Sequence, residues 1–93
     1  MEKVDPITPS QIEHSVDEVW DGERLEERYN YLDYHFEEPG AYVRARVYFD
    51  DAQTATLFGP FEKRGSIARV TSHSMLDAAL VYLQRRYPNV QRR

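Results

Sequence analysis

The stretch from Arg28 to Phe49, RYNYLDYHFEEPGAYVRARVYF, constrains the fold of this chain more than any other. On both sides of Glu37-Glu38-Pro39-Gly40 the residues alternate in kind, which is the pattern of a half-buried antiparallel strand pair. Pairing Phe36 with Ala41 makes the numbers of facing residues sum to 77, and a tighter turn at Glu38-Pro39 leaves that sum unchanged. The sequence therefore predicts a β-hairpin whose register does not depend on the turn type.

In this register the two strands present one apolar face and one face rich in tyrosine and arginine. The apolar face predicts a core, and its members are Asn30, Leu32, Tyr34, Phe36, Ala41, Val43, Ala45 and Val47. The opposite face, the Tyr/Arg face, consists of Tyr29, Tyr31, Asp33, His35, Tyr42, Arg44, Arg46 and Tyr48. Asp33 is expected to face Arg44 at a cross-strand Cβ separation of about 4.5–5.5 Å. His35 is expected to face Tyr42 in the same way.

Thr54–Phe61 predicts a third strand. Its register has two alternatives, because a shift by one residue reverses the direction of every side chain. Burying Leu57 and Phe61 stabilises the fold by about 1.5–3 kcal/mol each, so we expect Asp50 to lie opposite Thr54. That register directs Ala55, Leu57, Gly59 and Phe61 to the core. Pro60 cannot donate to a ladder, which predicts an edge or a bulge there.

The C-terminal part predicts a helix over His73–Tyr87, after a short strand candidate at Ser66–Val70 and the N-cap types Thr71 and Ser72. The apolar stripe of this helix recurs at helical spacing and consists of Met75, Leu76, Ala79, Leu80, Leu83 and Tyr87. The tail Val90–Arg93 is expected either to fray or to lie along a sheet edge.

The N-terminal part is read as a loose arm over residues 1–7 followed by a helix over Pro9–Trp20. The evidence for this helix is that Ile12, Val16, Val19 and Trp20 would form one apolar face of it. A strand is the alternative, because Ile12, His14, Val16, Glu18 and Trp20 also alternate. Asp21-Gly22 would then be a hairpin turn.

These elements predict one domain over residues 1–93, a two-layer α+β sandwich. A three- to four-stranded antiparallel meander would pack against an N-terminal and a C-terminal helix. Both helices would cover the apolar face of the sheet. The Tyr/Arg face would then meet either water or a partner.

Composition excludes several classes of function. The chain has 93 residues and no Cys, so disulfides, thiolate chemistry and Cys-based metal sites are absent. The longest apolar run, Ala78–Leu83, is too short to cross a membrane. The N-terminus lacks the pattern of a secretory signal, so a cytoplasmic location is expected.

The charge is −4 overall but unevenly distributed. Residues 1–40 hold twelve Asp or Glu and three Lys or Arg, whereas residues 41–93 hold four and nine. We expect the two halves to face each other in the fold. An acidic chain is also poorly suited to sequence-independent binding to nucleic acid, because the neutralisation of phosphates by basic side chains supplies most of that affinity.

No phosphate loop, nucleophile elbow, paired-histidine motif or calcium loop occurs in the sequence, so no cofactor or metal is expected. The first hypothesis is a non-enzymatic binding protein that uses the Tyr/Arg face to contact another protein or a second copy of itself, since Tyr and Arg are enriched at interface hot spots. The second is binding of nucleic acid or an anionic ligand through Arg44, Arg46 and neighbouring tyrosines. The third is an enzyme that uses His35, Asp33 and Arg44. The Asp33–Arg44 pair also fits a plain cross-strand ion pair on a solvated face.

Overall fold

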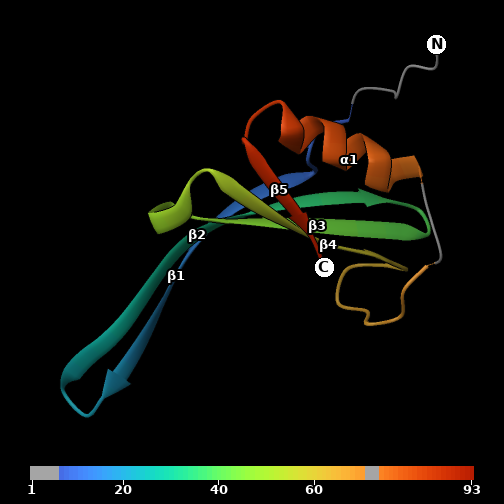
Figure 1. The fold of residues 1–93 in the computed structure, drawn as a ribbon. Helices are drawn as coiled ribbons and strands as arrows, with labels where there is room; N and C mark the ends of the chain where they lie inside the picture. Colours follow the sequence, from blue (N-terminus) through green and yellow to red (C-terminus); the bar gives the residue numbers. More distant parts are fainter. Residues whose placement is uncertain (1–6, 71–73) are drawn as a thin grey trace.

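The computed structural model describes residues 7–70 and 74–93, which form a five-stranded sheet and one α-helix (Figure 1). The elements in chain order are β1 (Gln11–Asp21), β2 (Arg24–Glu38), β3 (Ala41–Tyr48), the 3-10 turn η1 (Phe49–Asp51), β4 (Thr54–Phe61), α1 (Ser74–Gln84) and β5 (Asn89–Arg92). The strands lie in the order β1-β2-β3-β4-β5. All neighbours are antiparallel except β4 and β5, which run parallel.

The predicted sandwich of a three- to four-stranded antiparallel meander with an N-terminal and a C-terminal helix is wrong. The sheet has five strands, of which β4 and β5 run parallel, and residues 11–21 form strand β1 instead of a helix. The apolar residues Ile12, Val16 and Trp20 are four apart, a spacing that places them on one side of a strand as well as of a helix. The strand alternative was correct. It is favoured here because residues 24–35 supply a complete antiparallel partner and because Gly22, at φ 61°, closes the turn between Asp21 and Arg24.

The hairpin of β2 and β3 forms as predicted, but its register differs by two residues. Glu38 pairs with Ala41, so the turn is Pro39-Gly40. Gly40 has φ 84°, and Pro followed by a Gly of positive φ is the combination of a type II turn. A shift of two residues keeps every side chain on its predicted face but changes its partner.

Strand β4 confirms two of the core positions predicted for it and contradicts a third. Ala55 and Leu57 are buried in the core. Phe61 lies on the opposite face, where its ring is 6.5 Å from that of Tyr42. The cause is a bulge at Gly59-Pro60. It shifts the pairing with β3 and turns the side chain of the strand's last residue to the other face of the sheet. The candidate strand at Ser66–Val70 reduces to a single bridge between Phe61 and Arg69.

Helix α1 confirms the predicted C-terminal helix over Ser74–Gln84 but ends three residues before the predicted Tyr87. Residues 71–73, and residues 1–6 of the predicted arm, lie outside the residues that the structure describes. Helix α1 packs on the apolar face of the sheet (Figure 1). The core consists of Tyr34, Phe36, Ala41, Val43, Ala45, Val47, Ala55, Leu57, Met75, Leu76, Ala79 and Leu83. The tail takes the second of its two predicted positions, as edge strand β5. Among the described residues, no helix combines the length and apolar composition that a membrane crossing needs.

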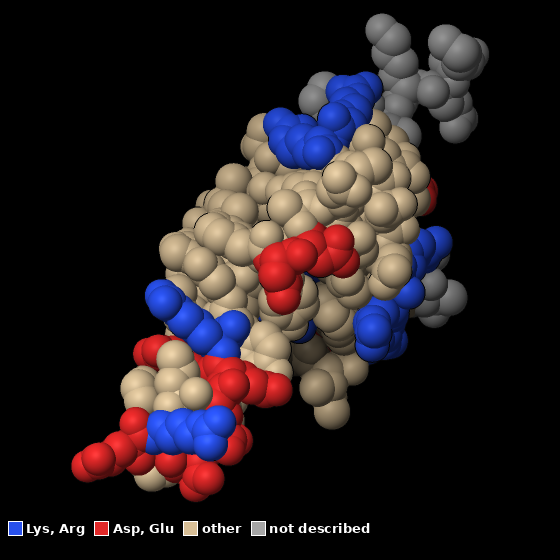
Figure 2. All heavy atoms as spheres, turned by 60° about the vertical axis from the view of Figure 1, so that its left-hand side comes forward, with Lys and Arg blue, Asp and Glu red and all other residues tan. Residues whose placement is uncertain are grey.

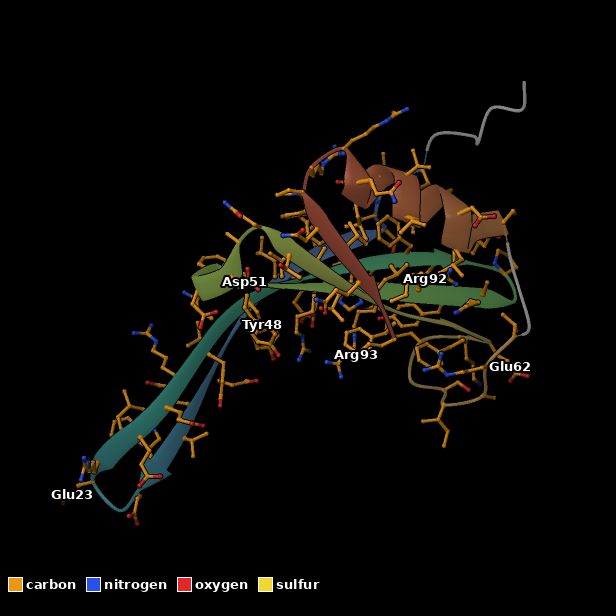
Figure 3. The ribbon with its side chains drawn as sticks, viewed as in Figure 1. Glu23, Tyr48, Asp51, Glu62, Arg92 and Arg93 are labelled. Atoms are coloured by element: carbon orange, nitrogen blue, oxygen red, sulfur yellow. The ribbon has the colours of Figure 1, made fainter. Side chains whose placement is uncertain are left out.

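Strands β1 and β2 continue well beyond the rest of the sheet. Strand β3 pairs with β2 only as far as Tyr31, so residues 15–30 form a two-stranded ribbon that extends from the body (Figure 1). This ribbon, the projecting hairpin, makes the molecule elongated, with extents of 56 × 29 × 20 Å. Glu23 lies at its tip, at the far end from Arg92 and Arg93 (Figure 3).

Candidate functional site

All eight residues predicted for the Tyr/Arg face lie on the sheet face opposite α1, but they pair differently. Asp33 faces Arg46, and His35 faces Arg44. Strand β1 adds to this face the residues Gln11, Glu13, Ser15 and Asp17, and β4 adds Thr56, Phe58 and Phe61. Sequence reasoning missed the residues of β1, because it placed them on a helix.

Asp33 and Arg46 form a two-pronged ion pair at the centre of this face. The Nε of Arg46 donates to Oδ1 of Asp33 at 2.8 Å, and its second terminal nitrogen donates to Oδ2 at 3.0 Å. The guanidinium also lies 4.0 Å from the centre of the Tyr31 ring. The hydrogen bond with Asp33 raises the pKa of Arg46. Asp33 is only 5 % exposed and the side chain of Arg46 is 24 % exposed, so this pair is largely buried. The sequence had predicted a solvated pair of Asp33 with Arg44, which the structure does not form.

His35 is equally buried and has a partner at each ring nitrogen. Its Nδ1 lies 2.6 Å from the hydroxyl of Tyr42, and its Nε2 lies 3.2 Å from a carboxylate oxygen of Glu13. Burial raises the pKa of Tyr42 above its ordinary value. Ligand atoms of Glu13, Asp33 and His35 lie within 4.8 Å of one another. Arg46 already binds both oxygens of Asp33 and brings a positive charge, so this group does not suit a cation.

Arginine side chains also lie near three other rings of the face. The guanidinium of Arg44 lies 4.8 Å from the ring centre of Phe58, that of Arg69 lies 5.1 Å from Phe61, and that of Arg64 lies 5.7 Å from Tyr42. In the part of the chain that the structure describes, the Nε of Arg44 is buried and has no hydrogen-bond partner. Arg44 therefore has one donor, its Nε, without a partner, whereas Arg46 uses its Nε and one terminal nitrogen to bind Asp33.

The tyrosines at the root of the projecting hairpin are bonded to acidic residues. The hydroxyl of Tyr31 donates to Asp17 at 2.7 Å, and that of Tyr29 donates to Glu27 at 2.6 Å. These hydrogen bonds raise the pKa of both tyrosines. Tyr48, at the end of β3, packs edge-on against both rings. A pocket of about 270 Å³ lies where the hairpin leaves the sheet, and its lining consists of Arg28, Tyr29, Asn30, Tyr48, Phe49 and Asp50.

The projecting hairpin carries the second candidate surface, which the sequence did not single out. It exposes the large apolar residues Val16, Val19, Trp20, Leu25 and Tyr29. Trp20 faces Leu25 across the ribbon, and its side chain is 55 % exposed. The sequence signal for this surface was the position of Trp20 and Leu25 on either side of the possible hairpin turn Asp21-Gly22. It was overlooked because a helix over Pro9–Trp20 would have buried the tryptophan in the core.

The two candidate surfaces differ in charge. Residues 15–30 hold six Asp or Glu and two Arg, and the acidic side chains crowd the tip of the molecule (Figure 2).

The predicted contact between the acidic and basic halves of the chain is found only in part. Asp33–Arg46 and the ion pair between Glu37 and Arg64 link them, but the projecting hairpin extends away from the body.

Comparisons with protein-family models, with curated proteins and with solved structures gave no significant match for this chain.

Proposed function

We propose that this chain is a non-enzymatic binding protein that works through protein–protein contact, with the projecting hairpin as its principal contact surface. The observation that carries the proposal is the exposure of Val16, Val19, Trp20 and Leu25 on a ribbon that, among the described residues, pairs with no further strand. A two-stranded ribbon is marginal by itself in water and gains stability when a further strand or surface covers it. Aromatic residues are also the usual anchors of protein interfaces.

The proposal moves the contact surface from the place that the sequence suggested. Tyr31 and Tyr42 of the Tyr/Arg face are buried, the first beneath Arg46 and the second beside Arg64. Tyr29 and Tyr48 remain accessible and adjoin the hairpin, so they extend the proposed surface. Catalysis is not part of the proposal, because His35 is buried with both ring nitrogens near protein partners. A chain without cysteine needs no oxidising compartment, which supports a site of action inside the cell.

Replacing both Trp20 and Leu25 with Ser is expected to weaken self-association or partner binding by about 2 kcal/mol or more, roughly thirtyfold in Kd. Light scattering measures self-association, and retention of other proteins on the immobilised chain measures partner binding. The control is Ile67→Ser, since Ile67 is 94 % exposed but lies far along the chain from the hairpin. The proposal fails if the double variant behaves like wild type in both assays.

A second candidate function is binding of an anionic ligand at Arg44, which the unpartnered and buried Nε of this residue favours. Arg44→Gln is expected to reduce the binding of a labelled single-stranded oligonucleotide, measured by fluorescence anisotropy. Arg85→Gln is the control, because it removes the same charge from the exposed end of α1. Binding must also weaken as salt rises, since it depends on phosphate contacts. Equal losses in the two variants, or no binding at low salt, would exclude this candidate.

A further inference from the structure

We propose that the partner of the projecting hairpin is a second copy of this chain, joined by antiparallel pairing of β1 with β1 about a two-fold axis. This inference rests on the proposed function and identifies the partner. The two five-stranded sheets would become one sheet of ten strands. Because the axis is perpendicular to the sheet, both α1 helices would lie on the same face.

Strand β1 has the properties of an edge that is open to pairing. It is an edge of the sheet over all 11 residues, and no Pro, Gly or Lys interrupts it. The register shift between β1 and β2 arises from an extra residue on β2, Glu26, so β1 itself stays regular. Natural proteins protect free edges by short length, bulges, Pro or Lys. The opposite edge, β5, is protected by its length of four residues, whereas β1 has acidic residues as its only protection.

Backbone geometry restricts how two copies of β1 can pair. Only alternate residues of an edge strand direct their N–H and C=O groups away from the sheet. A two-fold pairing must therefore place one residue opposite its own copy, with the other residues paired symmetrically around it. The number of possible registers is small, and the charges of β1 distinguish them.

Centring the pair on Val16 gives a register in which no two like charges face each other. Ile12 then faces Trp20 of the second copy, and His14 faces Glu18. The remaining pairs are Glu13 with Val19, Ser15 with Asp17, and Gln11 with Asp21. All 11 residues of the strand find a partner. Opposite charges and apolar pairs at directly facing positions each stabilise a sheet by roughly 0.2–1 kcal/mol.

The neighbouring registers are less favourable. Centring on Ser15 places Glu13 opposite Asp17, and centring on Asp17 or Glu18 places that carboxylate opposite its own copy. Like charges at facing positions destabilise a sheet. Centring on His14 avoids such pairs but joins only residues 11–17 and leaves Trp20 without a partner. The sequence of β1 therefore favours the register centred on Val16.

This pairing also stabilises the projecting hairpin. The tip of each hairpin would lie beside the start of the other copy's β1, so that the two-stranded ribbon becomes part of a four-stranded one. On the face that carries α1, Ile12 would then face Trp20 of the second copy and Val16 would face its own copy, with the His14–Glu18 pairs between these apolar pairs. Leu25 of each copy lies next to Trp20 on the neighbouring strand. A ribbon of three or more strands with an apolar face is stable where two strands are marginal.

The chain has no cysteine, so a single introduced thiol tests the register. Val16→Cys is expected to form a covalent dimer under mild oxidation, because residue 16 faces its own copy. Val19→Cys is the matched control: it has the same side chain, similar exposure and the same strand. In the proposed register its two thiols are separated by roughly 20 Å, or six residues of strand. Val16→Cys should cross-link about tenfold faster or more, as expected for thiols held close together.

A non-covalent variant tests the association itself. Val16→Lys places two ammonium groups opposite each other, so light scattering should find a dimer for wild type and a monomer for the variant. Val16 is partly exposed, so the monomer should keep its fold by circular dichroism. The inference is overturned if wild type stays monomeric at high micromolar concentration, or if Val19→Cys cross-links as fast as Val16→Cys. A monomeric wild type that loses a different protein partner upon the Trp20 and Leu25 replacements would refute the self-pairing but leave the proposed function standing.

Discussion

Replacing Asp33 with Ala is expected to lower the free energy of unfolding by about 3 kcal/mol, the lower end of the range for removing one partner of a buried ion pair. The carboxylate is almost wholly buried and accepts two hydrogen bonds from Arg46. Without it the guanidinium keeps its place over Tyr31 with no counter-charge. The lower end applies because the side chain of Arg46 retains 24 % exposure, so water can solvate part of the unpaired charge. Urea denaturation followed by circular dichroism measures the change.

Two further variants separate the ion pair from a general effect of losing charge. Asp51→Ala removes a carboxylate from an exposed turn, and such surface changes alter stability by about 0.5 kcal/mol or less. Combining Asp33→Leu with Arg46→Met replaces both charges with apolar groups, which should recover much of the loss caused by Asp33→Ala alone. Equal destabilisation by Asp33→Ala and Asp51→Ala would contradict a structural role for this pair.

The central ion pair changes the interpretation of the Tyr/Arg face. The alternation of Arg28–Phe49 correctly identified which residues share the face. It could not reveal that the guanidinium groups of two arginines would lie over neighbouring rings and cover much of the surface. Arg46 on Tyr31 and Arg44 on Phe58 cover aromatic area with their long side chains, as amphipathic side chains commonly do. A face that was expected to meet either water or a partner is therefore largely covered by its own side chains.

The sequence predicted the elements whose pattern admits a single interpretation. Strands β2, β3 and β4, helix α1 and most of the core were correct. The partners within the β2–β3 hairpin were wrong, because a two-residue shift leaves the alternation unchanged and only the geometry of Pro39-Gly40 decides between the registers. Phe61 was misplaced for a related reason, since the bulge at Gly59-Pro60 turns the side chain of Phe61 to the other face of the sheet, which the sequence pattern does not show.

Strand β1 shows the limit of periodicity. Residues four apart share one side of both a helix and a strand, so Ile12, Val16 and Trp20 fit either structure. The deciding factor is the availability of a partner strand in residues 24–35, which is a tertiary property. This one error also hid the candidate contact surface, because a buried N-terminal helix leaves no reason to ask what covers Trp20.

Replacing Leu83 with Ala is expected to lower the free energy of unfolding by about 2–5 kcal/mol. Leu83 is 0 % exposed and lies on α1, the one α-helix in the described part of the chain, where it completes the core beneath the sheet's apolar face. The loss combines the transfer of the removed carbon atoms with the cavity that remains, because neighbouring side chains relax only partly. Urea denaturation at low protein concentration measures it.

Leu25→Ala makes the same chemical change at a residue that is 41 % exposed on the projecting hairpin, which makes it a matched control. In dilute solution, where the chain is monomeric, it should alter stability by about 0.5 kcal/mol or less. At concentrations where two copies pair, it should become destabilising, because Trp20, which faces Leu25, then also pairs with Ile12 of the second copy and association adds to stability. Leu83→Ala should show a deficit of similar size at both concentrations. A cost for Leu25→Ala that is large and independent of concentration would mean that the hairpin packs against its own chain, which contradicts both the observed projection and its proposed role.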